Sequence, residues 1–439
     1  MTKGESMTAI VESPVEKRSK ARKAAIAGGV GTLIEYYDFG VYGFLAIYIA
    51  PLFFVSENAA VPILATLAVF GVAYFARPFG GIFFGTLGDK VGRKPALVLS
   101  VILMGVASSV LGLLPTYVAI GVGAPILLVL VRLVQGFSAG GEIGGSATYI
   151  AESAPKNRRG LYGSFTPIGS TLGFSVAAAV VGLTTLIVGA DAMATWGWRI
   201  PFLMSIPLTL ICLWVRLHLE DTAAAERIEK TGAKEKMPVV AVIKAHPASI
   251  LKIVGIAIAM NGTGYVGLTY FSVYLINDIG YSAQSIHWIS ALGIGLACMT
   301  YPLSGLLSDV FGRKPVFMIG CAVYVVIAVP VFLILGMGSS LVVVTAVYFF
   351  YIALNGVLQV PAFPLFTELF PAAVRYSGVA LGFNIGTIVA GGTAPYIAAQ
   401  LVESTGTPIA PAFWVMGVAL LGLLTMLTVK ETAKGELPV

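Results

Sequence analysis

The chain has 439 residues, of which 57% are hydrophobic and 11% are charged, and its formal net charge is +6. A soluble globular domain carries about 25% charged residues, so this composition excludes an ordinary water-soluble protein. The mean hydropathy of +0.91 instead predicts an integral membrane protein that crosses the bilayer several times.

A polar stretch, residues 1–24, comes first and ends in a cluster of Lys and Arg. The apolar run at about 26–54 is too long for the hydrophobic region of a signal peptide, so we interpret it as a retained first span. Eleven further apolar runs are each long enough for one transmembrane helix. They lie at about 59–87, 96–114, 125–149, 160–189, 199–217, 251–276, 285–308, 315–335, 340–363, 374–401 and 410–429.

The positions of the basic residues predict the orientation of these spans. Of the 27 Lys and Arg residues, 24 lie in the two tails and in alternate loops. Loops rich in Lys and Arg stay on the cytoplasmic side, so we expect both termini in the cytoplasm and the spans in the plasma (inner) membrane. This distribution explains the basic net charge without a nucleic-acid partner.

A long charged loop, residues 219–249, divides the spans into six and six. We therefore expect an all-α integral membrane protein with twelve transmembrane helices in two pseudo-symmetric bundles. The bundles are predicted at 25–218 and 250–430, with cytoplasmic tails at 1–24 and 431–439.

Two motifs occur once in each half of the chain. Gly85-x3-Asp89-x2-Gly92-Arg93-Lys94-Pro95 recurs in the second half as Gly305-x3-Asp309-x2-Gly312-Arg313-Lys314-Pro315. Glu152-x2-Pro155-x3-Arg159 likewise recurs as Glu368-x2-Pro371-x3-Arg375. Two repeats of six spans in the same orientation imply an axis along the membrane normal and a pathway between the halves.

The doubled first motif resembles the signature of the major facilitator superfamily, and Arg132-x2-Gln135-Gly136-x3-Gly140 resembles its fourth-span motif. Narrower motifs resemble the metabolite:proton symporter family: Glu35-Tyr36-Tyr37-Asp38-Phe39, Arg77-Pro78-x-Gly80-Gly81, Gly140-Gly141-Glu142 and Trp196-Gly197-Trp198-Arg199-Ile200-Pro201. The resemblance covers nearly the whole chain and is greatest to the proline and betaine transporters of that family.

The resemblance implies the major facilitator fold and proton-coupled import of a small polar organic solute by alternating access. A zwitterion like proline or glycine betaine is the first expectation. Relatives with similar signatures carry 2-oxoglutarate, citrate or shikimate, so a proton symporter of organic carboxylates is one alternative. An uncoupled facilitator is the other.

Charged side chains inside the bilayer are costly and usually functional. Five are predicted there, all in the first half: Glu35, Asp38, Arg77, Arg132 and Glu142. The helical rise of about 1.5 Å per residue places Glu35 near the depth of Arg77 and lets Asp38 approach Arg132. A desolvated carboxyl group without a cation can exchange a proton near neutral pH, so Asp38 and Glu142 are the first candidates for the proton carrier. The alternative is a set of fixed ion pairs that hold the helices together.

The substrate-binding candidates combine one arginine, aromatic rings and neutral polar groups. An anionic group would suit an arginine, whereas a quaternary ammonium would suit aromatic rings. The later spans offer only neutral polar side chains, so we expect the second half to form much of the substrate-reading wall. The candidates are Tyr42, Arg132, Gln135, Tyr149, Phe165, Asn261, Tyr265, Gln359 and Asn384.

The repeated motifs lie at cytoplasmic helix ends, where their charges can form a gate that breaks and re-forms during transport. We expect Glu152 to engage Arg93 or Lys94, and Glu368 to engage Arg313 or Lys314. The predicted gate residues are Asp89, Arg93, Lys94, Glu152, Arg159, Asp309, Arg313, Lys314, Glu368 and Arg375.

No pattern in the sequence indicates an enzyme. The three histidines are isolated, and the three cysteines lie far apart inside apolar stretches, so neither a metal site, a catalytic group nor a disulfide framework is expected. No Walker loop is present for ATP. We expect a monomer that needs no cofactor, with the solute, protons and the lipid bilayer as its partners.

Overall fold

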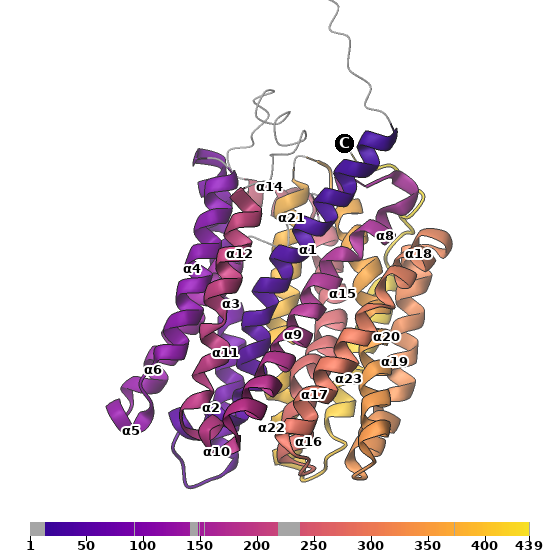
Figure 1. Cartoon of the computed structure of the whole chain (residues 1–439). Coiled ribbons are helices and arrows are strands. Elements are labelled where there is room, and N and C mark those ends of the chain that lie inside the picture. The colour runs from indigo at the N-terminus through magenta and orange to yellow at the C-terminus, as the bar shows by residue number, and fades with distance from the viewer. Residues whose placement is uncertain are drawn as a thin grey trace, which may run out of the picture.

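The structure is a computed structural model that describes residues 14–91, 93–140, 148, 150–152, 154–217, 238–372 and 374–438 (Figure 1). All regular secondary structure in these residues is helical. Eight helices are long and apolar enough to cross a membrane, two bent helix pairs make ten, and two shorter apolar helices complete twelve spans. The predicted all-α fold is confirmed.

The first half of the chain forms six spans. They are built from α1 (Pro14–Phe44), α2 (Ala46–Phe53), α3 (Ala60–Val91), α4 (Arg93–Leu113), α5 (Tyr117–Ile120), α6 (Gly123–Ala139), η1 (Lys156–Arg158), α8 (Arg159–Gly163), α9 (Phe165–Val188), α10 (Ala190–Ala192), η2 (Met193–Gly197), α11 (Arg199–Leu203) and α12 (Ser205–Leu217).

The second half repeats this arrangement after the short helix α14 (Pro238–Ala245), which lies in the predicted central loop. Its spans are built from α15 (Pro247–Tyr265), η3 (Val266–Tyr270), α16 (Phe271–Asn277), α17 (Ala283–Cys298), α18 (Tyr301–Phe311), α19 (Arg313–Gly336), α20 (Leu341–Glu368), α21 (Arg375–Gly386), η4 (Thr387–Gly392), α22 (Ala394–Thr405) and α23 (Pro411–Leu427).

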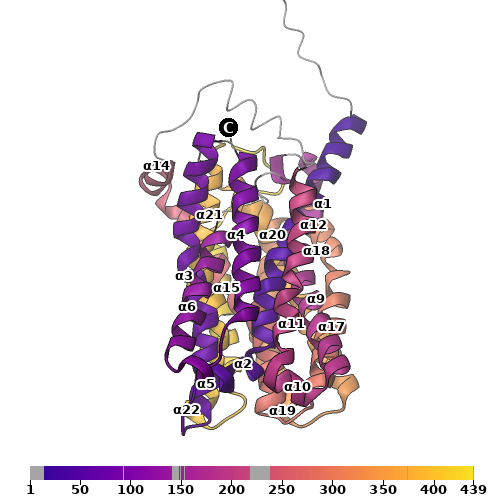
Figure 2. The same cartoon turned by 60° about the vertical axis from the view of Figure 1, so that its left-hand side comes forward.

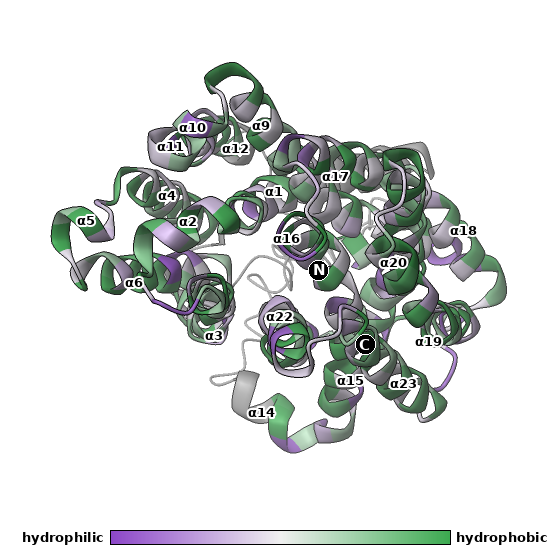
Figure 3. Cartoon of the chain, turned by 90° about the horizontal axis from the view of Figure 1, so that it is seen from below, coloured by the Kyte–Doolittle hydropathy of each residue, from purple (hydrophilic) through white to green (hydrophobic). Residues whose placement is uncertain are grey.

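The helices run roughly parallel, and the described chain begins and ends at the same end of the molecule (Figures 1 and 2). We call this end, where α14 and the start of α1 lie, the terminal face, and the other end the opposite face. Seen from the opposite face, the two halves lie side by side (Figure 3). They meet along α1, α3 and α9 of the first bundle and η3, η4, α17 and α22 of the second. Large apolar side chains cover the outside, among them Leu186, Phe311 and Val326, as expected for a surface in lipid.

Several spans are bent or locally unwound. The first span bends by 61° between α1 and α2, and the sixth by 56° before α11. The sixth span starts at Ala190, earlier than the predicted residue 199, because a π-helical turn, η2, continues the helix through a stretch with the polar residue Asp191. Segments η3 and η4 are also π-helical, and they border the first bundle at α1 and α3.

Glycines allow the closest helix contacts. In α21, a Cβ atom at Gly382 would lie 2.8 Å from Ile253, and one at Gly386 would lie 2.5 Å from Ala257, so the spaced glycines pack against α15. The segment 261–264 of α15 stays α-helical, and the helix widens only at the π segment that follows.

Candidate functional site

A buried ion pair joins α1 and α3 of the first bundle. Arg77 of α3 donates a hydrogen bond from Nη2 to Oε1 of Glu35 on α1, at 3.0 Å, and both side chains are almost fully buried. The sequence predicted this pairing from the similar depth of the two residues. The same guanidinium lies 4.5 Å from the ring centres of Phe39 and Tyr74, so aromatic faces surround the cation.

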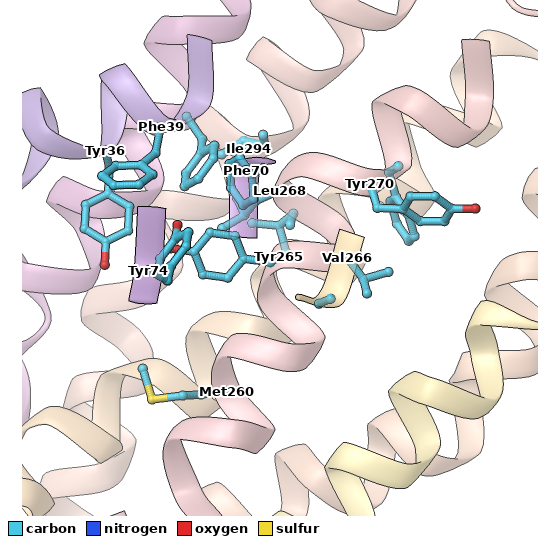
Figure 4. Packing of buried hydrophobic residues seen from close by; sticks show 14 of the residues in the cluster. Tyr36, Phe39, Phe70, Tyr74, Met260, Tyr265, Val266, Leu268, Tyr270 and Ile294 are labelled. Carbon is cyan, nitrogen blue, oxygen red and sulfur yellow. The ribbon is translucent and has the colours of Figure 1, made fainter. Parts of the chain in front are cut away.

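The aromatic group connects the two bundles. The hydroxyl groups of Tyr74 on α3 and Tyr265 on α15 form a hydrogen bond of 2.7 Å. The ring of Tyr265 packs edge-on against Phe70 and Phe174 of the first bundle, and Figure 4 shows Tyr74 and Tyr265 next to each other. The Glu35–Arg77 pair is therefore one side chain away from the second bundle.

Arg132 of α6 is held by neutral groups. Its guanidinium donates to Oε1 of Gln135 at 2.9 Å and to the carbonyl oxygen of Phe70 at 3.4 Å, and it lies 4.3 Å from the ring centre of Tyr42. Gln135 donates in turn to the hydroxyl of Ser108 at 2.8 Å. The predicted candidates Tyr42, Arg132 and Gln135 therefore form one buried cluster inside the first bundle.

Asp38 of α1 is buried and makes no ion pair with any residue that the structure describes. Its Oδ1 atom lies 2.7 Å from the hydroxyl oxygen of Ser205, and Ser108 also lies beside the carboxyl group. The expected approach to Arg132 is therefore indirect, because Ser108 and Gln135 lie between them.

The second bundle presents amide groups on α15 and α20. Asn261 donates to the hydroxyl of Thr387 at 3.0 Å, and Asn355 donates to the carbonyl oxygen of Met260 at 3.0 Å. Gln359 forms a short hydrogen bond with Asn355. These groups are buried and neutral, as the sequence predicted for this half.

A small pocket lies between the bundles, with free space for about one water molecule. Its walls are hydroxyl, amide, aromatic and aliphatic groups from both bundles: Thr32, Tyr36, Thr166, Ser170, Met260, Asn261, Tyr265, Leu268, Gln359, Phe363 and Phe383. The bundles are therefore closed around a site much smaller than an organic solute.

Only part of the predicted substrate set reaches this pocket. Asn261, Tyr265 and Gln359 line it. Phe165 does not, because its backbone faces Gly29 of α1, and the next residue, Thr166, lines the pocket instead. Asn384 bridges the bundles near the pocket through a 3.4 Å hydrogen bond to the carbonyl oxygen of Gly140.

Other predicted residues cannot be placed, and some contributors were missed. Glu142 and Tyr149, together with the side chains of Asp89, Arg93 and Lys94, lie outside the described residues. Tyr74, Ser108 and Ser205 were not predicted from the sequence. Tyr74 lies one helical turn before Arg77, a spacing that could have shown that the two side chains share a face.

At the terminal face, Asp309 of α18 reaches across to the first bundle. Its two carboxylate oxygens accept hydrogen bonds from the backbone N–H groups of Gly160 and Leu161, at 2.7 and 2.9 Å. Arg313 donates to the same carboxylate at 2.8 Å. The approach requires glycine on both sides, because a Cβ atom at Gly160 would lie 2.5 Å from the carbonyl oxygen of Gly305.

The second repeated motif pairs across the bundles. Arg375 of the second bundle forms a 2.8 Å ion pair with Glu152 of the first, and Arg159 of the first lies 3.9 Å from Glu368 of the second. The predicted contact of Glu368 with Arg313 is also present, at 3.5 Å. Each acid of the repeat therefore faces the arginine of the other half.

The segment after α23 lies over this charge network. Glu431 accepts hydrogen bonds from the backbone N–H groups of Arg313 and Lys314, at 2.9 and 3.0 Å, at the start of α19. Lys314 donates to the carbonyl oxygen of Val429 rather than to Glu368. Glu436 forms a 2.8 Å ion pair with Lys156, so the segment contacts both bundles.

Two six-span bundles that enclose a central pocket, with a network of charges across one face, define a membrane transporter rather than an enzyme. No group of three or more His, Cys, Asp or Glu that could hold a metal ion occurs in the described part of the chain. The chain belongs to the major facilitator superfamily: the model of the family described as "Sugar (and other) transporter" matches residues 24–438.

Several known proteins are similar to this chain. It is 40% identical to the glycine betaine/proline/ectoine/pipecolic acid transporter OusA of Dickeya dadantii (strain 3937), over 95% of this chain and 85% of that protein. It is 36% identical to the shikimate transporter of Escherichia coli (strain K12), over 95% and 96%. The fold matches that of the proton:xylose symporter XylE with a TM-score of 0.77 at 17% identity, covering 96% and 98% of the two chains. The family expected from the motifs is confirmed.

Proposed function

We propose that this transporter is a proton symporter that imports a small zwitterion of the proline or glycine betaine type by alternating access. The pocket supports this choice, because its described walls are neutral. Arg77 is neutralised by Glu35, and Arg132 is enclosed by Gln135 and aromatic rings. A zwitterion has no net charge, whereas a di- or tricarboxylate would bring unpaired charge into the membrane. The substrates in the name of the OusA relative agree with this choice.

The proposed proton carrier is Asp38, and the hydrogen bonds around Ser205 support it. The hydroxyl oxygen of Ser205 lies 2.7 Å from Asp38 Oδ1 and 2.6 Å from the carbonyl oxygen of Phe202. A hydroxyl group has one proton and can donate to only one of these oxygens. Both contacts are satisfied only when the carboxyl group carries a proton and donates to Ser205. Glu35, in contrast, is held by Arg77, and Glu142 stays a second candidate.

We infer that the terminal face is cytoplasmic. The described basic residues of the predicted cytoplasmic loops, among them Lys156 and Lys314, lie at this face, which agrees with the positive-inside rule, so the opposite face would be external to the plasma membrane. In this topology, residues 25–218 and 250–430 are the two moving bundles, and one chain is sufficient for transport as a monomer.

The charge network at the terminal face is the proposed cytoplasmic gate, closed in this structure. Asp309, the Glu152–Arg375 pair and the Arg159–Glu368 contact each join the two bundles. Release of substrate to the cytoplasm requires the bundles to separate here, so all these contacts must break together.

Proton flux in proteoliposomes tests the function. Purified transporter is exposed in turn to proline, glycine betaine, ectoine, 2-oxoglutarate, citrate and shikimate while the internal pH is followed. Internal acidification with a zwitterion, abolished in Asp38→Asn, is the expected result. Asp191→Asn, which removes an exposed acid of the same bundle, is the matched control and retains acidification.

Other outcomes identify the alternatives. Acidification only with the carboxylates overturns the zwitterion assignment and makes the chain a carboxylate symporter. Uptake of radiolabelled solute without proton movement makes it an uncoupled facilitator. Unchanged coupling in Asp38→Asn assigns the proton to another acid, with Glu142→Gln as the next variant.

A further inference from the structure

A histidine lies between the bundles near the opposite face and has no part in the proposed transport chemistry. His287 is on the first turns of α17 and is fully buried. Its ring centre is 6.2 Å from that of Phe44 on α1 and 6.3 Å from that of Tyr48 on α2. On the third side, a Cβ atom at Gly182 of α9 would lie 3.3 Å from the Cβ atom of His287. The ring is therefore enclosed by the other bundle.

The polar atoms of this ring are not satisfied. The carbonyl group of Phe44 lies beside the ring, but neither Nδ1 nor Nε2 makes a hydrogen bond of ordinary geometry with any residue that the structure describes. A neutral imidazole has one donor and one acceptor, and an imidazolium has two donors. Such a ring in a permanently closed interface costs stability, so an apolar residue would close this contact better.

No described acid can neutralise a charge on this ring. Helix α9 has no ionisable side chain, and the acids of α1 lie more than one helical turn before Phe44. In α20 the only acid, Glu368, lies at the terminal face. Asp278, after α16, has Tyr270 and Glu403 as its neighbours. Apart from the basic residues at the start of α1, the other ionisable groups on the facing elements are tyrosines: Tyr36, Tyr37 and Tyr42 of α1, Tyr48 of α2, Tyr270 of η3, Tyr274 of α16, and Tyr348 and Tyr351 of α20.

We propose that His287 is a second proton-binding site, separate from Asp38, that takes up a proton only when the bundles separate at the opposite face. In the closed state an imidazolium would be a buried cation without a counter-charge. In the open state water reaches the ring and solvates the charge. A proton that binds one of two states shifts the equilibrium toward that state, so acid at the opposite face favours opening there.

The size of this shift toward the open state follows from the pKa of the ring when water reaches it. With the ordinary imidazole pKa of about 6.5 in the open state and no protonation in the closed state, the ratio of open to closed protein rises about tenfold between pH 7.5 and 5.5. The assignment of the opposite face to the outside of the cell rests on the proposed function. Proton binding at His287 does not rest on it, since this binding needs neither substrate nor a gradient.

Distances between two spin labels in the full-length protein in nanodiscs test the proposal. One label replaces Val118 on α5 and the other replaces Met337 after α19, both highly exposed and on different bundles at the opposite face. The native cysteines are buried. The expected result without substrate is a roughly tenfold rise in the ratio of open to closed protein from pH 7.5 to 5.5.

Three variants decide the origin of that rise. His287→Gln and His287→Phe keep a side chain in the interface but cannot bind the proton, so both are expected to lose the pH response. His246→Gln, at the terminal face, is the matched control and retains it. The proposal is overturned if the wild type shows no pH response, or if both His287 variants keep it. Loss of symport in the flux assay leaves these outcomes unchanged, so the two proposals fail independently.

Discussion

The Glu35–Arg77 pair gives the sharpest test of how charge is stabilised in the first bundle. The two groups are 3.0 Å apart and almost fully buried, so neutralising either one removes the counter-charge that the other has at this contact. Such a loss costs about 3–5 kcal/mol of stability. The double variant Glu35→Gln/Arg77→Gln leaves no charge behind. We therefore expect its cost to fall below the sum of the single costs by about 2 kcal/mol or more.

The assay is a double-mutant cycle on the free energy of unfolding in lipid bicelles. Contacts of Arg77 with Phe39 and Tyr74 are lost in every variant that lacks the arginine, so they cancel in the cycle. Single costs that simply add, with a coupling energy below about 0.5 kcal/mol, would refute the reasoning.

Transport by the same variants separates two roles of the pair. A double variant that is stable but inactive shows that the charges take part in the transport cycle. A double variant that accumulates substrate like the wild type shows that the pair only holds the helices together.

Three further variants test two contacts between the bundles and the attachment of the segment after α23. Asp309→Asn weakens charge-assisted hydrogen bonds worth about 1.5–3 kcal/mol each. Distances between spin labels across the terminal face should therefore show at least a tenfold gain in the population of the open state. Unchanged distances would contradict the proposed gate. Tyr74→Phe removes the hydrogen bond to Tyr265 and should destabilise the closed state by about 1 kcal/mol, measured by single-molecule fluorescence. Tyr37→Phe, which removes a hydrogen bond to the carbonyl oxygen of Pro201 inside the first bundle, is the control. Partial burial alone would raise the pKa of Glu431, but backbone N–H donors outweigh it and lower the pKa below the usual range. Because the pKa is lowered, Glu431 stabilises the attachment of this segment to α19 fully above the ordinary glutamate pKa of about 4.3. That stabilisation is lost as the pH falls through the lower folded value. Protease cleavage after α23 should then increase in acid, and Glu431→Gln should remove that pH dependence.

The sequence predicted the spans and the Glu35–Arg77 ion pair because both depend on local information. Runs of about 20 apolar residues define helices that cross lipid, whatever their neighbours are. The Glu35–Arg77 contact could be predicted because both residues are charged in the membrane and lie at similar depth in the first two spans.

The hydrogen bonds of Asp38 could not be predicted in the same way. Its neighbour Ser205 lies 167 positions away, in the part of the sixth span that follows its bend, and an isolated serine in an apolar helix carries little signal. The rotation of each helix about its own axis decides which side chains meet, and apolar periodicity is weak in spans that face lipid on one side and protein on the other. The same reason explains why Thr166, rather than Phe165, lines the pocket.

The sequence predicted that each acid of the repeated charge motif contacts basic residues of its own half. The structure adds ion pairs between the two halves, and these have a different energetic consequence. An ion pair inside one bundle survives when the bundles separate, so it cannot favour the closed state over the open state. In the structure, Glu152 pairs with Arg375 and Glu368 faces Arg159, and each contact takes one residue from each half. Separation of the bundles breaks both at once and leaves Glu152, Arg159 and Arg375 to be solvated, whereas Glu368 keeps its contact with Arg313. In the proposed gate, the crossed contacts would therefore favour the closed state, an energetic role that a pair within one half could not have.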